Sequence, residues 1–395
     1  MKRILLFSLL IIHFSFLYAA DFGVLLNGKF DVAGADETDA SGSVILAPWF
    51  SLPFEKSELY ISAGLNVSIS DDIYFAPEIF RLEFSSQPSP LFSFRVGRFP
   101  WEDPSGLVAK GRFDGADILL NIGKVRLGVN GLYTGFLFKD TAEINVSPTD
   151  TKDYSAGFDW AEFTDTYFAP RRVIASLYGE FPGIPSGRGR LYAGLAAQFD
   201  LSGADEAFHT QYLLLRHNLV FKAFDLIVSG AAELENTEAD GLRPAFAFSL
   251  EGGWQLPGAM PDRLSLGAAW ASGDGSATAA FFPVTMEAMS FVLRPAFSGI
   301  MIIKANYKAR LLQSLSAELG GLYFIRTDSN SFVYPSLEDD SYPLGAEMDL
   351  GLLWVPLSDL SLSLKGGVFL PKTGTAWSDD APVLWRITVG TMFSF

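Results

Sequence analysis

The chain contains no cysteine and only three histidines. Without cysteine, neither a disulfide framework nor a thiolate metal site can form. His209 and His217 are eight residues apart on one predicted strand, about 27 Å when extended, which is too far to share a metal ion. Neither lies in a catalytic motif, and no phosphate loop of the G-x-x-x-x-G-K-[ST] type is present. We therefore predict that the protein is not an enzyme and has no metal and no cofactor.

Long apolar runs are also missing after residue 20, although 49% of the residues are hydrophobic and 35 are Phe. A membrane-spanning helix needs about 18 or more consecutive apolar residues, so helical spans are excluded. A chain this apolar then either buries a large soluble core or spreads its apolar residues around a barrel that faces lipid. The formal net charge of −16 argues against a nucleic-acid partner.

The N-terminus predicts a cleaved signal peptide. Lys2 and Arg3 precede an apolar stretch over 4–16, and Ala19 and Ala20 supply small residues before Asp21. The apolar stretch is too short for a permanent anchor. We assign residues 1–20 to the signal peptide, with cleavage after Ala19 as an alternative, and residues 21–395 to a single domain.

The alternation of apolar and polar residues favours a lipid-facing barrel over a soluble core. From 59 to 70 every odd position is apolar, while the even positions carry Tyr, Ser, Gly and Asn. The segments 191–201, 224–234 and 360–370 repeat this pattern. Each stretch is about ten residues long, as a tilted membrane strand requires, whereas strands of soluble domains average about 5 or 6 residues.

Weaker alternation predicts further strands and brings the total to about eighteen or nineteen. They are expected at 22–32, 43–52, 73–84, 91–99, 113–122, 125–136, 171–181, 209–221, 243–255, 263–271, 286–294, 300–311, 315–326, 344–355 and 383–395. Because bacterial single-chain barrels prefer an even number, we predict an all-β, transmembrane, antiparallel up-and-down β-barrel of about 18 strands, with 16 as the alternative.

Short turns and longer loops are predicted to alternate along the chain. Turns are expected at 123–124, 187–189, 313–314 and 356–359, and would face the periplasm. Extracellular loops are expected at 100–112, 139–169, 273–283, 327–343 and 371–382. The loop over 139–169 is the longest and is acidic. It either folds inward as a constriction or solvates the rim, and we favour the rim because an acidic exposed loop needs no other explanation.

The last strand resembles the β-signal of outer-membrane proteins. It reads polar-x-Gly-x-x-apolar-x-apolar, with Thr388, Gly390, Phe393 and Phe395 at the specified positions. A strand with a free edge can pair with the open edge of the barrel-assembly machinery. The resemblance implies that this machinery is a partner, that the protein resides in the bacterial outer membrane, and that its outward face contacts outer-membrane lipid.

Inward-facing charges predict the pore lining. Lys304, Lys308 and Arg310 share one parity and would form a basic ladder. Other charges on inward parity have both signs: Arg81, Arg95, Arg126, Arg386, Glu83, Asp117, Asp225, Glu233, Glu318, Glu347 and Asp349. Two interpretations remain open, a transverse field that weakly selects solutes and cross-strand ion pairs that hold the wall together.

Two further regions resemble bacterial porins, including the alginate-export family. One is Arg95-Val96-Gly97-Arg98-Phe99 followed by Phe113-Asp114-Gly115, and the other is Gly345 to Leu350 followed by 360–371. The resemblance implies a closed, roughly 18-stranded monomeric barrel with an arginine-lined lumen. It assigns pore-lining roles to Arg95, Arg98, Glu347 and Asp349.

These patterns predict an outer-membrane porin for the passive diffusion of small hydrophilic solutes or acidic saccharides. One alternative is a gated transporter of hydrophobic substrates, because Leu119, Ile227 and Phe369 interrupt the polar inward face. Another is a structural or adhesive barrel that presents the 139–169 loop outside the cell.

Overall fold

A computed structural model describes residues 20–395, apart from residues 36, 71–72, 147–156, 185–186, 202–207, 238–240, 259, 330, 333, 335–336 and 338–340. The predicted signal peptide therefore lies outside the described residues, except for residue 20. The first strand begins at Asp21. No helix in the described ranges is long and apolar enough to cross a membrane.

The described chain forms eighteen strands and three short helical segments. The strands are β1 (Asp21–Gly34), β2 (Thr38–Phe54), β3 (Ser57–Ile69), β4 (Ile73–Ser89), β5 (Phe92–Glu102), β6 (Lys110–Ile122), β7 (Val125–Tyr133), β8 (Arg172–Pro182), β9 (Gly189–Asp200), β10 (His209–Phe221), β11 (Phe224–Thr237), β12 (Gly241–Gln255), β13 (Arg263–Ala271), β14 (Ile300–Arg310), β15 (Leu315–Arg326), β16 (Pro343–Leu357), β17 (Leu360–Leu370) and β18 (Leu384–Ser394). The helical segments are α2 (Lys139–Ala142), α4 (Phe163–Thr166) and η1 (Pro371–Thr373).

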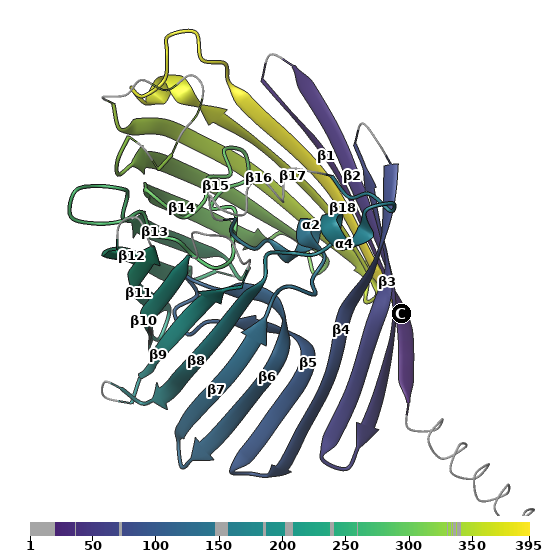
Figure 1. The fold of residues 1–395 in the computed structure, drawn as a ribbon. Helices are drawn as coiled ribbons and strands as arrows, with labels where there is room; N and C mark the ends of the chain where they lie inside the picture. Colours follow the sequence, from purple (N-terminus) through teal and green to yellow (C-terminus); the bar gives the residue numbers. More distant parts are fainter. Residues whose placement is uncertain are drawn as a thin grey trace, which may run out of the picture.

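All eighteen strands form one closed antiparallel sheet (Figure 1). Each strand pairs with its neighbours in the chain, and β18 pairs with β1 from Leu25 opposite Ser394 to Gly34 opposite Trp385. Closure leaves no free sheet edge, so the backbone groups of every strand have partners within the wall. The predicted up-and-down barrel of 18 strands is confirmed.

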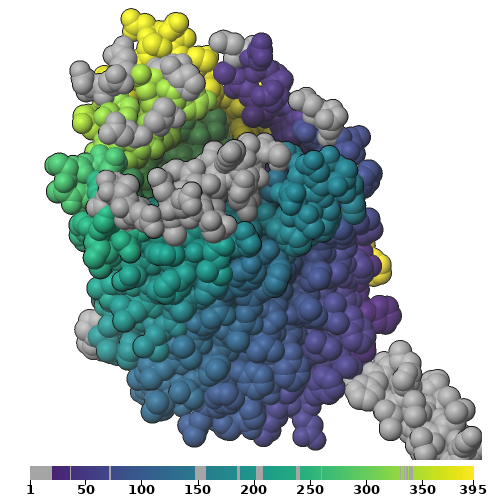
Figure 2. Space-filling model, viewed as in Figure 1, coloured from purple at the N-terminus to yellow at the C-terminus, as the bar shows by residue number. Residues whose placement is uncertain are grey.

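The two ends of the barrel differ. One end, which we call the turn end, contains the start of β1 and the end of β18. Its connections include the two-residue turns 55–56, 123–124, 222–223 and 358–359. The four predicted turns all lie there. The loop end carries the long connections, including 134–171 and 272–299. In Figure 2 the side chains of the strands close the outer wall on the side viewed, and the described loops gather above it.

Strand alternation separates an apolar outer face from a mixed inner face. On β10, Leu213 and Leu215 point outward and are exposed, while Thr210, Tyr212 and Leu214 point inward and are buried. Other strands repeat this division, with exposed Leu, Ile, Val and Phe outside and small or polar residues inside. This arrangement is the one expected of a wall that faces hydrocarbon on one side only.

One predicted strand was wrong. Residues 286–294 belong to the 272–299 loop, which folds into the barrel between β13 and β14. Val292 and Leu293 are buried there, which explains why a short apolar run resembled a strand, since periodicity alone does not separate the two cases. Removing this segment from the nineteen predicted strands leaves the eighteen observed.

The 139–169 loop also differs from the favoured interpretation, because part of it folds inward. Within it, Ala142, Ile144 and Tyr167 are buried inside the barrel. Apolar side chains interspersed among the acidic ones give this segment a face that packs against the interior. The acidic composition therefore described only its solvated face.

Candidate functional site: a septum across the barrel and the cavity beside it

Three loops meet inside the ring of strands (Figure 1). Asn145 N donates to Val284 O at 2.9 Å, and Met286 N donates to Glu143 O at 2.6 Å. On the other side of the same segment, Thr285 N donates to Val108 O at 3.2 Å. Residues 103–109, 137–145 and 281–293 thus form one hydrogen-bonded partition, which we call the septum.

A buried glutamate on β16 anchors one end of the septum. Glu347 is completely buried, and its carboxylate accepts hydrogen bonds from Phe291 N at 2.8 Å and from Val292 N and Leu293 N at 2.9 Å. It also accepts the Ser290 hydroxyl at 3.0 Å. Gly367 on β17 provides space, because a Cβ there would lie 2.9 Å from Phe291 and Val292.

A second glutamate holds the septum on the other side of the lumen. Glu233 on β11 accepts a hydrogen bond from Phe282 N at 2.8 Å. The Tyr212 hydroxyl on β10 donates to Phe282 O at 2.6 Å. Both polar groups of the Phe282 backbone are therefore bound to the wall, as buried backbone requires.

A third glutamate fixes the segment that follows β7. Glu78 on β4 accepts the Thr141 hydroxyl at 2.7 Å and pairs with Arg112 at 2.8 Å. Tyr167 stacks on Phe138 with ring centroids 4.9 Å apart and donates its hydroxyl to Pro77 O. Burial raises the pKa of Tyr167 to about 12, so the hydroxyl stays protonated and remains a donor.

Asp103 shapes the septum segment between β5 and β6. One carboxylate oxygen accepts from Ser105 N at 2.7 Å and Gly106 N at 3.0 Å, and the other accepts from Val108 N at 2.9 Å and Ala109 N at 2.8 Å. Gly106 has a φ of +70°, which disfavours other residues. The loop closes around this single side chain.

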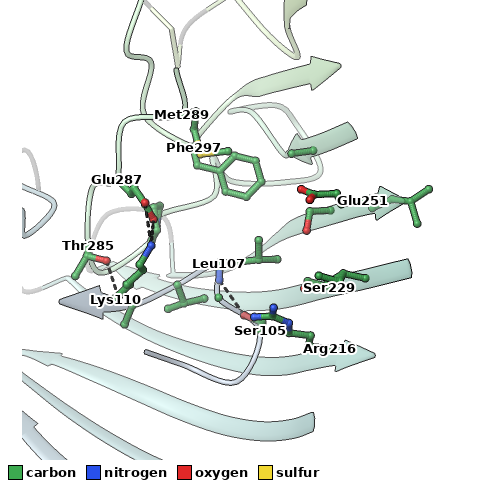
Figure 3. Close-up of a pocket in the computed structure, with 18 of the residues that line it drawn as sticks. Ser105, Leu107, Lys110, Arg216, Ser229, Glu251, Thr285, Glu287, Met289 and Phe297 are labelled. Carbon is green, nitrogen blue, oxygen red and sulfur yellow. Dashed lines mark hydrogen bonds and ion pairs between the residues drawn. The ribbon is translucent and has the colours of Figure 1, made fainter. Parts of the chain in front are cut away.

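A cavity of about 350 Å³ lies between the septum and the wall formed by β10 to β14 (Figure 3). We call it the septum cavity. Its polar lining includes Ser105, Lys110, Arg216, Ser229, Ser249, Glu251, Thr285, Glu287 and Lys304. Its apolar lining includes Leu107, Ile227, Met289 and Phe297.

The cations of the septum cavity are all paired with carboxylates. Lys110 lies 3.0 Å from Glu287, Lys304 lies 2.6 Å from Glu251, and Arg216 lies 3.7 Å from Glu102. The pair on β14 and β12 meets across Gly267 of β13, where a Cβ would lie 2.7 Å from the Lys304 side chain. The glycine therefore permits this contact between strands that are not adjacent.

The comparisons with known proteins show a likeness in fold. No family model and no curated protein matches the chain. Among solved structures from Pseudomonas aeruginosa, OccK5 (OpdH) has a TM-score of 0.64 at 11% identity, covering 96% of this chain and 99% of its own. OccK2 (OpdF) in complex with glucuronate has a TM-score of 0.62 at 14% identity, covering 96% and 98%. OpdQ has a TM-score of 0.63 at 10% identity, covering 95% and 98%.

The chain has the fold of these outer-membrane porins. At such identities the likeness concerns the fold alone, and the predicted resemblance to the alginate-export family is not confirmed by it.

The predicted basic ladder is not a continuous basic surface. Besides the Lys304–Glu251 pair, Lys308 lies 4.0 Å from Glu318. Arg310 is at the turn end, where it donates to Gln313 O at 2.6 Å. The geometry thus favours the interpretation of cross-strand ion pairs over a ladder of free cations.

The other predicted pore-lining cations are also paired. Arg81 contacts Glu83 at 2.7 Å, Arg95 contacts Asp117 at 3.0 Å, and Arg126 contacts Glu180 at 3.6 Å. They lie on the inner parity of their strands. Asp349 is on the same face of β16 and contacts Lys365 at 3.5 Å, whereas Glu347 is covered by the septum and is completely buried.

Arg98 is placed differently from its prediction. Its register partners Leu82 and Asp114 set it on the face of exposed Val96, opposite that of Arg95. The guanidinium is buried at the loop end, pairs with Asp114 at 2.7 Å and donates to Phe136 O at 2.9 Å. Strand parity, which assigns positions 95 and 98 to opposite faces, outweighs the motif here, so the pore-lining assignment of Arg98 was wrong.

Thr388, Gly390 and Phe393 of the predicted assembly signal lie in the closing strand β18, and Phe395 follows it directly. The Thr388 hydroxyl donates to Asp31 of β1, and Gly390 leaves space for Ser363 of β17. Phe393 and Phe395 are exposed on the outside, with ring centroids 5.5 Å apart. Val24 N donates to Phe395 O at 2.9 Å, so the C-terminal residue is hydrogen-bonded to β1.

Sequence reasoning missed the septum and two of its anchors. Glu78 and Asp103 carried no predicted role, and Glu233 was recognised only as an inward charge. A usable signal existed for Asp103, because Asp-Pro-Ser-Gly is typical of a turn in which the Asp side chain accepts backbone N–H groups. The anchoring glutamates had no local signal, since their partners are distant in sequence.

Proposed function

We propose that the protein is a passive channel for small hydrophilic solutes in a bacterial outer membrane. The observation that carries this proposal is the division of the closed wall. Its outer face exposes Leu, Ile, Val and Phe, while its inner face carries ion pairs and a polar septum cavity. Such a wall suits lipid outside and water inside, and the septum cavity lies between the inward loops and this wall.

The residues that we propose line this aqueous path are Arg81, Arg95, Asp117, Arg126, Lys304, Lys308, Arg310 and Asp349. Glu347 contributes indirectly, because it holds the septum that narrows the lumen. The likeness to porins, one of them described in complex with glucuronate, supports solutes of this size. Membership of the alginate-export family remains a proposal based on residues 95–99 and 113–115.

The proposed partners are outer-membrane lipid, which would contact the apolar exterior, and the barrel-assembly machinery, which would recognise β18. The exposed Phe393 and Phe395 at the turn end support the second partner. Residues 1–20 are proposed to direct export and to be removed.

Planar-bilayer recording tests the channel directly. Protein refolded in detergent and inserted into a bilayer should give discrete conductance steps, and liposomes containing it should swell in isotonic solutions of small solutes. A folded barrel, verified by its β-type circular dichroism spectrum, that produced neither current nor swelling would refute the proposal.

A further inference from the structure

We propose that the septum cavity selects uncharged polyhydroxyl solutes of about monosaccharide size over acids and amines of the same size. This inference rests on the proposed channel function and specifies its solute class. It depends on the charge balance, the polar and apolar lining and the size of the septum cavity.

Charge balance is the first argument. Three cations, Lys110, Arg216 and Lys304, and two carboxylates, Glu251 and Glu287, line the cavity. Glu287 pairs with Lys110 and Glu251 pairs with Lys304, while Arg216 pairs with Glu102, which lies outside the lining. The partners in the first two pairs are 3.0 and 2.6 Å apart, far less than the Debye length of about 8 Å at physiological ionic strength. A solute beside such a pair therefore meets a short dipole rather than a net charge.

These pairs are partly exposed, and exposed pairs contribute little to stability, about 0–1 kcal/mol. Their consequence for permeation is different, because each carboxylate cancels the field of one cation. A charged solute would have to give up part of its hydration in the septum cavity without gaining an unpaired partner. An uncharged solute has no such penalty.

The remaining lining fits a sugar. Ser105, Ser229, Ser249 and Thr285 bring hydroxyl groups to the cavity, and hydroxyls both donate and accept hydrogen bonds. Met289 and Phe297 lie together on the 272–299 loop and form an apolar side, while Leu107 lies beside Ser105 (Figure 3). The C–H face of a pyranose can pack on this side while its hydroxyls reach the polar one.

Size is the third argument. A cavity of about 350 Å³ lies near the lower end of the range for small-molecule sites, roughly 300–1,000 Å³. A single sugar ring suits this space better than an oligosaccharide does.

The test compares glucose, glucuronate and glucosamine in liposome-swelling assays, since these solutes share a ring and differ in charge. We expect glucose to enter fastest. Swelling with all three but fastest with glucuronate or glucosamine, or at equal rates, would overturn the inference and leave the channel intact. No swelling with any solute would instead overturn the channel itself.

A second test removes the charge of one partner of the Lys110–Glu287 pair at a time. The two variants should shift the selectivity in opposite directions. Glu287→Gln should leave Lys110 without its carboxylate partner. Glucuronate should then enter about threefold faster, as expected for the attraction of a unit charge about 7 Å away in water. The reversal potential should shift toward that of an anion-selective channel. Lys110→Met should free Glu287 and favour glucosamine to a similar extent. Glu162→Gln and Lys124→Met, which change the same charges outside the cavity, serve as controls. Equal effects of the cavity variants and their controls would contradict the proposal.

Discussion

Removing the Glu347 carboxylate should release one end of the septum. In Glu347→Ala, three backbone N–H groups and the Ser290 hydroxyl lose their acceptor. Hydrogen bonds to a charged group contribute about 1.5–3 kcal/mol each. Because water can enter the space and satisfy some donors, we expect a net loss of about 3–5 kcal/mol for docking of residues 290–293, within the range for truncating one partner of a buried charged contact. The docking equilibrium should then fall by roughly 10² to 4 × 10³-fold.

Because the chain has no native cysteine, a maleimide reacts only with the thiol that is introduced. Leu293→Cys places a thiol in the buried anchor, and its reaction with a water-soluble maleimide reports local undocking. We expect labelling to accelerate by about 100-fold or more when Glu347→Ala is added, together with a larger single-channel conductance. Asp225→Asn is the control, because the Asp225 carboxylate pairs with Arg263 at 2.8 Å near the turn end of the wall, away from the septum anchor.

The reasoning would be refuted by a folded Glu347→Ala protein whose labelling rate and conductance equal those of the parent. An equal response to Asp225→Asn would also contradict it, since the effect would then reflect wall charge in general.

Three further predictions concern other parts of the molecule. Asp103→Ala removes the acceptor of four backbone N–H groups and should disorder the β5–β6 loop, seen as faster amide hydrogen exchange over 104–109 with the strands unchanged. Gly267→Val should displace Lys304 from Glu251 and shift the reversal potential in a salt gradient. Gly230→Val on β11, where a Cβ would make only an ordinary contact 3.9 Å from Ala247 O, should not. Phe395→Ala should slow assembly in cells without lowering the conductance of protein refolded in vitro; normal assembly would argue against an anchoring role for Phe395.

Strand number and strand faces could be predicted because they follow from local pattern. Successive side chains of a strand point to opposite sides, so the alternation in 59–69 or 360–370 already divides lipid-facing from inward-facing residues. Short turns follow from residues such as Gly123, whose φ of +64° suits glycine. The same rule assigns Arg98 to the outward face of β5, although the motif that contains it suggested the lumen.

The inward loops could not be predicted, because their partners are far away in the chain. Glu347 binds residues 54 to 57 positions earlier, and Thr285 meets Val108 across the lumen. An apolar run such as 286–294 has the same local appearance whether it lies in a wall or across the interior. Only the closed barrel creates the space that such a segment fills.

The sequence by itself thus determined a closed wall of alternating strands with an apolar exterior, since period-two alternation and turn residues act over a few neighbours. The tertiary structure decided what occupies the lumen and how its charges combine. Lys304 and Glu251 are on strands separated by β13, and they neutralise each other only because closure and register bring them together over Gly267. Ion pairs of this kind depend on distances of a few ångströms between remote residues, which no local pattern specifies.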